Sequence, residues 1–126
     1  MKLYFAIIII ALNSAFGFGQ TAEFRLDKAV FKFPKTYEGT QLEHDYLITN
    51  TGEVPLIISD YEVSCSCTTV DLPTSPILPR DTFALKVHFD TEGKYQFQDR
   101  IVYLTANTRQ GTHKIRFKVN VIPKNE

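Results

Sequence analysis

The stretch TFALKVHFD, residues 82–90, places an apolar side chain at every second position. The apolar set consists of Phe83, Leu85, Val87 and Phe89. Because successive side chains of a β-strand point to opposite faces, this spacing collects the apolar set on one face. The stretch therefore predicts a strand with one face buried against an interior and the other in contact with water.

The same spacing recurs elsewhere in the chain. Residues 114–122 alternate in this way, and a third row runs through residues 42–48. Shorter apolar segments occupy residues 30–33, 55–58 and 101–105. The last of these is apolar on both faces, which predicts a central strand.

Connections rich in Gly, Pro, Asn, Asp or Thr separate these rows, at residues 35–39, 50–53, 78–81, 91–94 and 107–111. In the second of them, Asn50 and Gly52 are expected to supply the positive φ angles that a tight connection can require. No window shows the 3.6-residue spacing of an amphipathic helix. The sequence therefore predicts an all-β fold, an immunoglobulin-like β-sandwich of about seven short strands.

Residues 1–19 have the composition of an export signal. One lysine precedes an apolar run at residues 3–12, and small residues follow. A membrane span needs about 20 apolar residues, so this run is too short to hold the chain in a bilayer. We therefore predict a signal peptide that is cut after Gly19, with a cut after Gly17 as the alternative.

The predicted mature chain, residues 20–126, has the size of a single domain. No cysteine lies near the predicted cut, so a lipoprotein anchor would have no attachment atom. The expected location is therefore the periplasm or the outside of the cell, without a membrane span.

The charge pattern argues against nucleic acid as a partner. The chain holds 14 basic and 14 acidic residues, for a formal net charge of +0. Its closest approach to a basic cluster is Lys114, Arg116 and Lys118, which puts one positive charge at every second position. That is the pattern of the polar face of a strand, whereas phosphate binding needs clustered lysine and arginine.

No pattern in the sequence predicts an active site. It contains no glycine-rich phosphate loop, no Gly-x-Ser-x-Gly turn and no histidine spacing typical of a metal site. His88 falls on the polar face of its predicted strand, His113 borders a turn, and His44 shares a face with the apolar residues of the row at 42–48. We therefore expect a protein without enzymatic activity and without a cofactor.

Two cysteines, the only ones in the chain, lie in the segment Ser64-Cys65-Ser66-Cys67-Thr68. On a regular strand, residues two apart lie about 6.6 Å apart on the same side, whereas a disulfide needs Cβ atoms roughly 3.5–4.5 Å apart. A Cys65–Cys67 bond therefore requires a bulge or a turn. An oxidising compartment favours such a bond, because the chain offers no other cysteine as a partner.

Four alternatives remain open for these two side chains. They can be buried as small apolar groups, joined in a local disulfide that is static or redox-active, used as ligands of a soft ion such as Cu(I), or paired with another molecule. The metal alternative needs further ligands, because a closed Zn²⁺ site takes four and no histidine stands at a typical spacing from Cys65 or Cys67.

The chain also carries a set of short motifs in a fixed order, namely Asn50-Thr51-Gly52, Pro55-Leu56-Ile57-Ile58, Ser64-Cys65-Ser66-Cys67-Thr68, Pro76-Ile77 followed by Pro79, Phe89-Asp90-Thr91, and Asn107. Their order and spacing resemble a family of exported proteins of Gram-negative bacteria, the domain-of-unknown-function family 1573. The resemblance extends from about Val30 to Val121. It implies an immunoglobulin-like fold akin to the major-sperm-protein and Hydin-type domains, and it implies no particular activity.

The chain departs from the family pattern at three glycines. Ser66 replaces the glycine between the cysteines, Arg80 replaces the glycine of a Pro-Gly turn, and Pro34 replaces the glycine of an early Phe-Gly pair. If the family glycine between the cysteines supplies an unusual backbone angle, Ser66 makes a tight Cys65–Cys67 bridge less favourable.

The leading hypothesis for function is an exported binding or structural module that contacts a protein or a component of the cell envelope through strand edges and end loops. The candidate loops are residues 65–79 and 91–97, and Tyr95 and Phe97 are either exposed aromatics or core residues at a strand start. The alternative hypothesis is a periplasmic thiol protein that binds Cu(I) or exchanges disulfides through Cys65 and Cys67.

Overall fold

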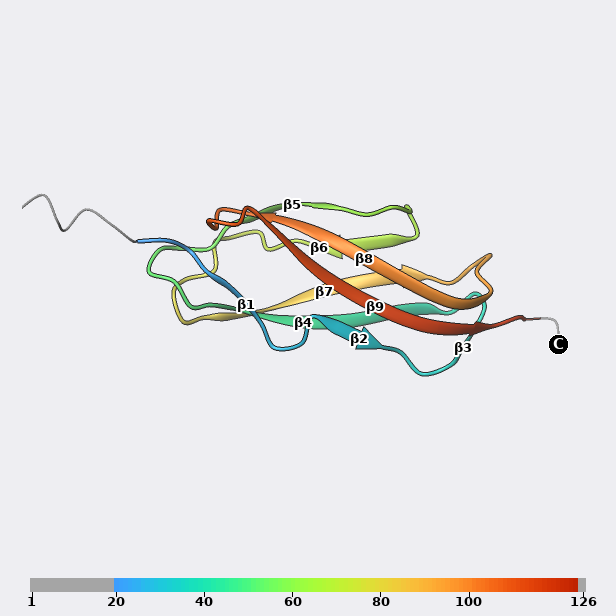
Figure 1. Cartoon of the computed structure of the whole chain (residues 1–126). Coiled ribbons are helices and arrows are strands. Elements are labelled where there is room, and N and C mark those ends of the chain that lie inside the picture. The colour runs from blue at the N-terminus through green and yellow to red at the C-terminus, as the bar shows by residue number, and fades with distance from the viewer. Residues whose placement is uncertain (1–19, 125–126) are drawn as a thin grey trace, which may run out of the picture.

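Apolar side chains at alternate positions bring two β-sheets face to face. The computed structural model describes residues 20–124, and nine strands run through them. Figure 1 shows the strands of both sheets running along the long axis of the molecule. The predicted signal peptide, residues 1–19, lies outside the described residues.

The first sheet has four strands in the order β1-β4-β7-β6. They are β1 (Phe24–Leu26), β4 (Gln41–Asn50), β7 (Thr82–Asp90) and β6 (Thr68–Asp71). The second sheet has five strands in the order β2-β9-β8-β5, with β3 also paired to β9. They are β2 (Val30–Lys32), β9 (Thr112–Ile122), β8 (Gln96–Ala106), β5 (Ile58–Glu62) and β3 (Thr36–Tyr37).

The interior contains the side chains that the alternation predicts. Residues 85, 87 and 89 of β7 are buried, and so are residues 115, 117, 119 and 121 of β9. Tyr46 of β4 crosses the interior, where its hydroxyl donates a hydrogen bond to the carbonyl oxygen of Arg116 at 2.7 Å. Burial raises the pKa of the Tyr46 phenol. The prediction of an all-β immunoglobulin-like sandwich is therefore confirmed.

Strand boundaries differ from the sequence expectation at several strands. β1 and β3 are only three and two residues long, too short for a period of two to be recognised. The strand expected at residues 55–58 begins at Ile58 instead, and Leu56 forms an isolated bridge with Ile77. Within the described residues there is no helix, and hence none that is long and apolar enough to cross a membrane.

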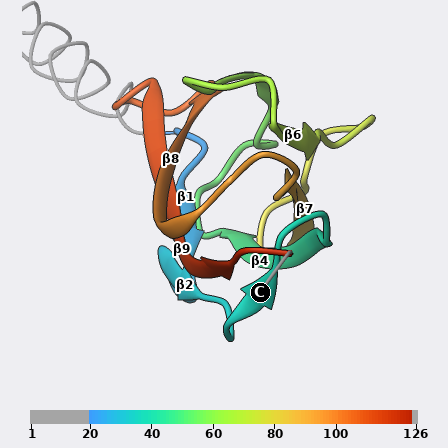
Figure 2. The same ribbon diagram turned by 90° about the vertical axis from the view of Figure 1, so that its right-hand side faces the viewer.

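One connection bridges the flank of the sandwich. β5 is an edge strand of the second sheet and β6 is an edge strand of the first, so residues 63–67 pass from one sheet to the other. They lie at the same end as the β7–β8 connection, because Thr68 is paired with Phe89. Figure 2 faces this end, which also contains the β3–β4 turn and the end of β9. We call it the crossover end.

The opposite end is organised by a buried amide, the side chain of Asn50, which has no exposed surface. Its Nδ2 donates to the carbonyl oxygens of Val54 and Ile77, at 2.8 and 3.0 Å. Its Oδ1 accepts from the backbone N–H of Gly52 at 2.9 Å and of Glu23 at 3.3 Å. Asn50 therefore joins three separate segments, and this satisfies the polar group that the fold buries.

Gly52 is required here for space. Its φ is not positive, so the expectation that Asn50 and Gly52 supply positive φ angles is wrong. A Cβ atom at this position would lie 2.1 Å from the carbonyl oxygen of Thr21. The first described residues pack directly on the glycine, and Glu53 N–H donates to the same Thr21 oxygen at 2.9 Å. Besides positive φ, the close approach of two backbones is the other common reason why a position requires glycine.

Arg80 has the left-handed backbone that a glycine would adopt without strain. Its φ is 72°, and it follows Pro79 in a turn that Asp81 N–H closes by donating to the Leu78 carbonyl oxygen at 3.0 Å. Proline at the second position and positive φ at the third define a type II turn, which favours glycine at the third. This is one of the three positions at which the chain departs from the glycine of the family pattern.

We predict that Arg80→Gly raises the free energy of unfolding. Relief of the left-handed conformation is worth roughly 1–2 kcal/mol, and the greater freedom of glycine in the unfolded chain offsets about 0.4–1 kcal/mol of it. Urea unfolding should give a net increase of about 0.5–1 kcal/mol. Arg109→Gly is the matched control, because Arg109 lies in another turn without positive φ. An equal increase in the free energy of unfolding of both variants would contradict the assignment of backbone strain to Arg80.

Candidate functional site

Cys65 and Cys67 are joined by a disulfide in the connection between β5 and β6. Their Cα atoms are 5.2 Å apart. Two residues of a regular strand would be about 6.6 Å apart, so the chain has to bend between them. It does so because β5 ends at Glu62 and the chain turns toward the other sheet before β6 begins at Thr68.

Backbone hydrogen bonds hold this turn in place. Thr68 N–H donates to the Cys65 carbonyl oxygen at 3.2 Å, and Asp90 N–H donates to the Cys67 carbonyl oxygen at 2.9 Å. Ser66 is exposed and has no positive φ, so the bridge does not need a glycine at this position. The expectation that Ser66 disfavours the bridge rested on an unusual backbone angle, which the turn does not use.

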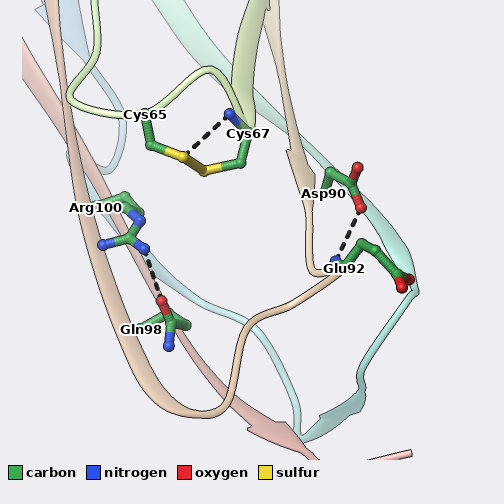
Figure 3. Close-up of a disulfide and its surroundings, with 6 residues drawn as sticks. All are labelled: Cys65, Cys67, Asp90, Glu92, Gln98 and Arg100. Atoms are coloured by element: carbon green, nitrogen blue, oxygen red, sulfur yellow. Dashed lines mark hydrogen bonds between the residues drawn. A yellow bond between two sulfur atoms is a disulfide. The ribbon is translucent and has the colours of Figure 1, made fainter.

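Both sulfur-bearing side chains are half-buried, and one further contact distinguishes them. The backbone N–H of Cys67 donates to the Sγ atom of Cys65 at 3.2 Å, as Figure 3 shows. An N–H donor favours negative charge on the sulfur that accepts from it. The two sulfurs of the bridge therefore lie in different electrostatic surroundings.

A positive charge lies among the residues around the bridge. Arg100 and Gln98 are on the inner face of β8, because they share the parity of the buried Val102 and Leu104. Arg100 Nη2 donates to Gln98 Oε1 at 2.7 Å, and its guanidinium carbon lies 5.7 Å from the ring centre of Phe89. Figure 3 shows both side chains on the β8 ribbon, below the turn that carries the disulfide. Sequence reasoning missed Arg100, because its position on the inner face depends on where β8 begins.

The three histidines belong to other contacts. His44 stacks on Phe31 with ring centres 3.6 Å apart, and His113 stacks on Phe24 at 4.2 Å. His88 lies on the outer face of β7, between the carboxylates of two neighbouring strands. In the described part of the chain, no group of three or more His, Cys, Asp or Glu side chains could hold a metal ion.

Exposed aromatic side chains also gather at the crossover end. Tyr95 and Phe97 are 55% and 57% exposed, so their side chains are on the surface. Tyr37 is 66% exposed and was not singled out by the sequence, because its two-residue strand has no readable period. Tyr37 pairs with Ile122 and Phe97 pairs with Asn120, so the two aromatics flank the end of β9.

Two packed sheets with a disulfide in the crossover between their edge strands define an immunoglobulin-like domain with a local cysteine bridge. Over residues 24–121 the chain matches the model of the family described as protein of unknown function (DUF1573). The match covers most of the chain, and the chain belongs to this family. No curated protein matches the sequence.

Solved structures share the fold at low sequence identity. A protein of unknown function from Porphyromonas gingivalis W83 is 18% identical with a TM-score of 0.71, and the match covers 85% of this chain and 50% of that one. The chain thus spans half the length of that protein. The seventh PapD-like domain of human CEP192 is 11% identical with a TM-score of 0.61, covering 89% and 92%. The Escherichia coli chaperone DraB is 12% identical with a TM-score of 0.56, covering 82% and 56%.

We predict that His44 makes stability depend on pH. Burial lowers the pKa of His44, and the smaller effect of Asp45 acts in the opposite direction. The unfolded chain therefore binds the proton first, as pH falls below about 6.5. The stability that the buried, neutral His44 contributes to the folded state is fully present above that pH. It is lost as pH falls through the lower pKa that His44 has in the folded state.

The measurement is the Tm at about pH 7.5 and about pH 5.5 for the wild type and for His44→Phe. The phenylalanine keeps a ring against Phe31 but does not titrate. The Tm of the variant should fall less between the two pH values. If the Tm falls by the same amount in both proteins, His44 does not contribute to the pH dependence.

Proposed function

We propose that this chain is an exported, non-enzymatic module that binds a protein or another component of the cell envelope. The observation that carries the proposal is the group of exposed aromatics Tyr37, Tyr95 and Phe97 at one end of the sandwich. Tyrosine and phenylalanine are enriched in protein interfaces, where their rings are buried on binding.

Tyr37 and Phe97 lie on one face of the second sheet, and Tyr95 is close to Phe97 in the chain. Val119 and Val121 of β9 point into the interior, so Asn120 and Ile122 lie on the outer face. Tyr37 and Phe97 are their cross-strand partners and share this face from opposite sides of β9. Gln96, between Tyr95 and Phe97, has a φ of 64°, a backbone conformation that side chains rarely adopt. Such residues occur preferentially in binding and switch regions.

The fold relatives support a binding role. The E. coli chaperone DraB has this sandwich, and so does the YadV chaperone, which is 14% identical with a TM-score of 0.53 and is matched over 52% of its length. A chaperone acts by binding other chains. Immunoglobulin-like sandwiches in general use their end loops and strand edges for recognition.

We predict export with removal of residues 1–19. Mass spectrometry of the protein isolated from the periplasm or medium of its own host should give a chain that starts at Gln20. A start at Phe18 would move the cut by two residues and keep the proposal. A cytoplasmic protein that retains its first residues would refute the exported location.

The binding surface can be tested by photo-crosslinking in the native host. A photoreactive amino acid placed at Phe97 should form a covalent adduct with a partner, and the adduct should be lost when Tyr37 and Tyr95 are also changed to serine. The control position is Leu47, which is 45% exposed on the outer face of the other sheet. These surface changes should alter stability by less than about 0.5 kcal/mol each. Equal adducts from Leu47 and Phe97 would argue against this surface.

A second function is favoured by the disulfide itself. A bridge between residues two apart encloses almost no chain, so it can contribute little to stability through loop closure. A bond with little structural value is a candidate for thiol–disulfide exchange through Cys65 and Cys67. The Cu(I) form of this hypothesis would need the bridge to be reduced and a further ligand from a partner.

A further inference from the structure

Arg100 is the one charged side chain on the inner face of β8. Its cross-strand partner is Phe117, which is 1% exposed, and its own Nε atom is buried without a hydrogen-bond partner in the described part of the chain. A buried guanidinium nitrogen without an acceptor is unfavourable and needs a reason. Asp99, the adjacent acid, points to the outer face and is ion-paired with Arg116. Among the described residues, Arg100 is therefore a positive charge that forms no ion pair with a carboxylate.

The disulfide lies at the same end of the sandwich as this charge. Arg100 lies over the ring of Phe89, and Phe89 is the cross-strand partner of Thr68, the residue after Cys67. Figure 3 shows Arg100 among the residues around the bridge, together with Asp90 and Glu92. The carboxylate of Asp90 already accepts hydrogen bonds from Gln41 and from the Glu92 backbone. Among the side chains that Figure 3 draws, Arg100 is the only cation.

A thiolate is the species that such a charge would stabilise. Cysteine thiolates form at lower pH beside arginine or lysine, and a thiol of lower pKa is the better leaving group in disulfide exchange. The N–H of Cys67 already donates to Cys65 Sγ at 3.2 Å. This N–H contact distinguishes the two sulfurs: it favours negative charge on Cys65 and leaves Cys67 Sγ as the atom at which an incoming thiolate attacks.

We propose that the Cys65–Cys67 bridge oxidises protein dithiols, with Cys67 as the attacked sulfur and Cys65 as the leaving thiolate that Arg100 stabilises. This inference rests on thiol–disulfide exchange, the second function proposed above. In the first step, a partner thiolate bonds to Cys67 Sγ and the Cys65–Cys67 bond breaks, so the electron pair remains on Cys65. In the second step, the partner's other thiolate attacks the partner sulfur of the mixed disulfide. The partner becomes a disulfide, and Cys67 leaves as a thiolate that takes a proton from solvent.

The attacked sulfur can be identified by trapping. The full mature chain is mixed with reduced glutathione, quenched with acid and alkylated, and the modified peptide is mapped by mass spectrometry. The proposal expects glutathione on Cys67 and the alkyl group on Cys65. The opposite assignment would overturn it.

The role of Arg100 is tested by exchange with reduced thioredoxin as a representative protein dithiol. Arg100→Gln should slow reduction of the bridge by about threefold or more, because a leaving thiolate of higher pKa leaves more slowly. Arg100→Lys should restore most of the rate. The control is Arg116→Gln, which removes a charge from the outer face of the adjacent β9 and should leave the rate unchanged.

A second readout does not depend on turnover. In Cys67→Ser, the absorbance of the Cys65 thiolate at about 240 nm should titrate below the ordinary thiol pKa of about 8.5, and adding Arg100→Gln should raise that midpoint. Circular dichroism checks that each variant has folded. If thioredoxin does not reduce the wild-type bridge, exchange itself fails as a function. If the bridge is reduced but neither the rate nor the titration responds to Arg100→Gln, only the role of Arg100 fails.

Discussion

The pairing register of β4 with β7 and of β8 with β9 is the constraint on which the rest of the structure depends. Because side chains alternate between the faces, a slip of one residue in either pair would turn the buried row outward. The register also sets which residues meet at the crossover end. It places Phe89 opposite Thr68 and Arg100 opposite Phe117, so the surroundings of the disulfide follow from the packing of the core.

The two ends of the sandwich are built by different means. At one end, the buried amide of Asn50 joins the chain near residues 23, 54 and 77. At the other end, a covalent bridge shapes the crossover, and the aromatic side chains of Tyr37, Tyr95 and Phe97 are exposed. The polar groups of the Asn50 amide are hydrogen-bonded within the described residues, whereas the crossover end exposes aromatic rings, a feature of a surface available to other molecules.

Much of the fold was predictable from the sequence, because three long rows of alternating residues specify the buried faces of β4, β7 and β9. The short strands were not, since β3 has only two residues and its pairing to β9 depends on the whole sandwich. For the site, Cys65 and Cys67 could be identified but their state could not, because the bond depends on the direction of the chain after Glu62. The position of Arg100 on the inner face of β8 could not be predicted for a similar reason. Residue 100 lies before residues 101–105, the segment from which this strand was predicted.

The close packing of Gly52 against the first described residues sets a practical boundary for handling this protein. Thr21 and Glu23 are part of the folded body, since their backbone atoms contact Gly52, Glu53 and Asn50. A shortened version that starts after Glu23 would therefore leave the Asn50 amide without one of its partners and open the space above the glycine. Purification tags and fusion partners are better attached beyond Ile122, where β9 has already ended.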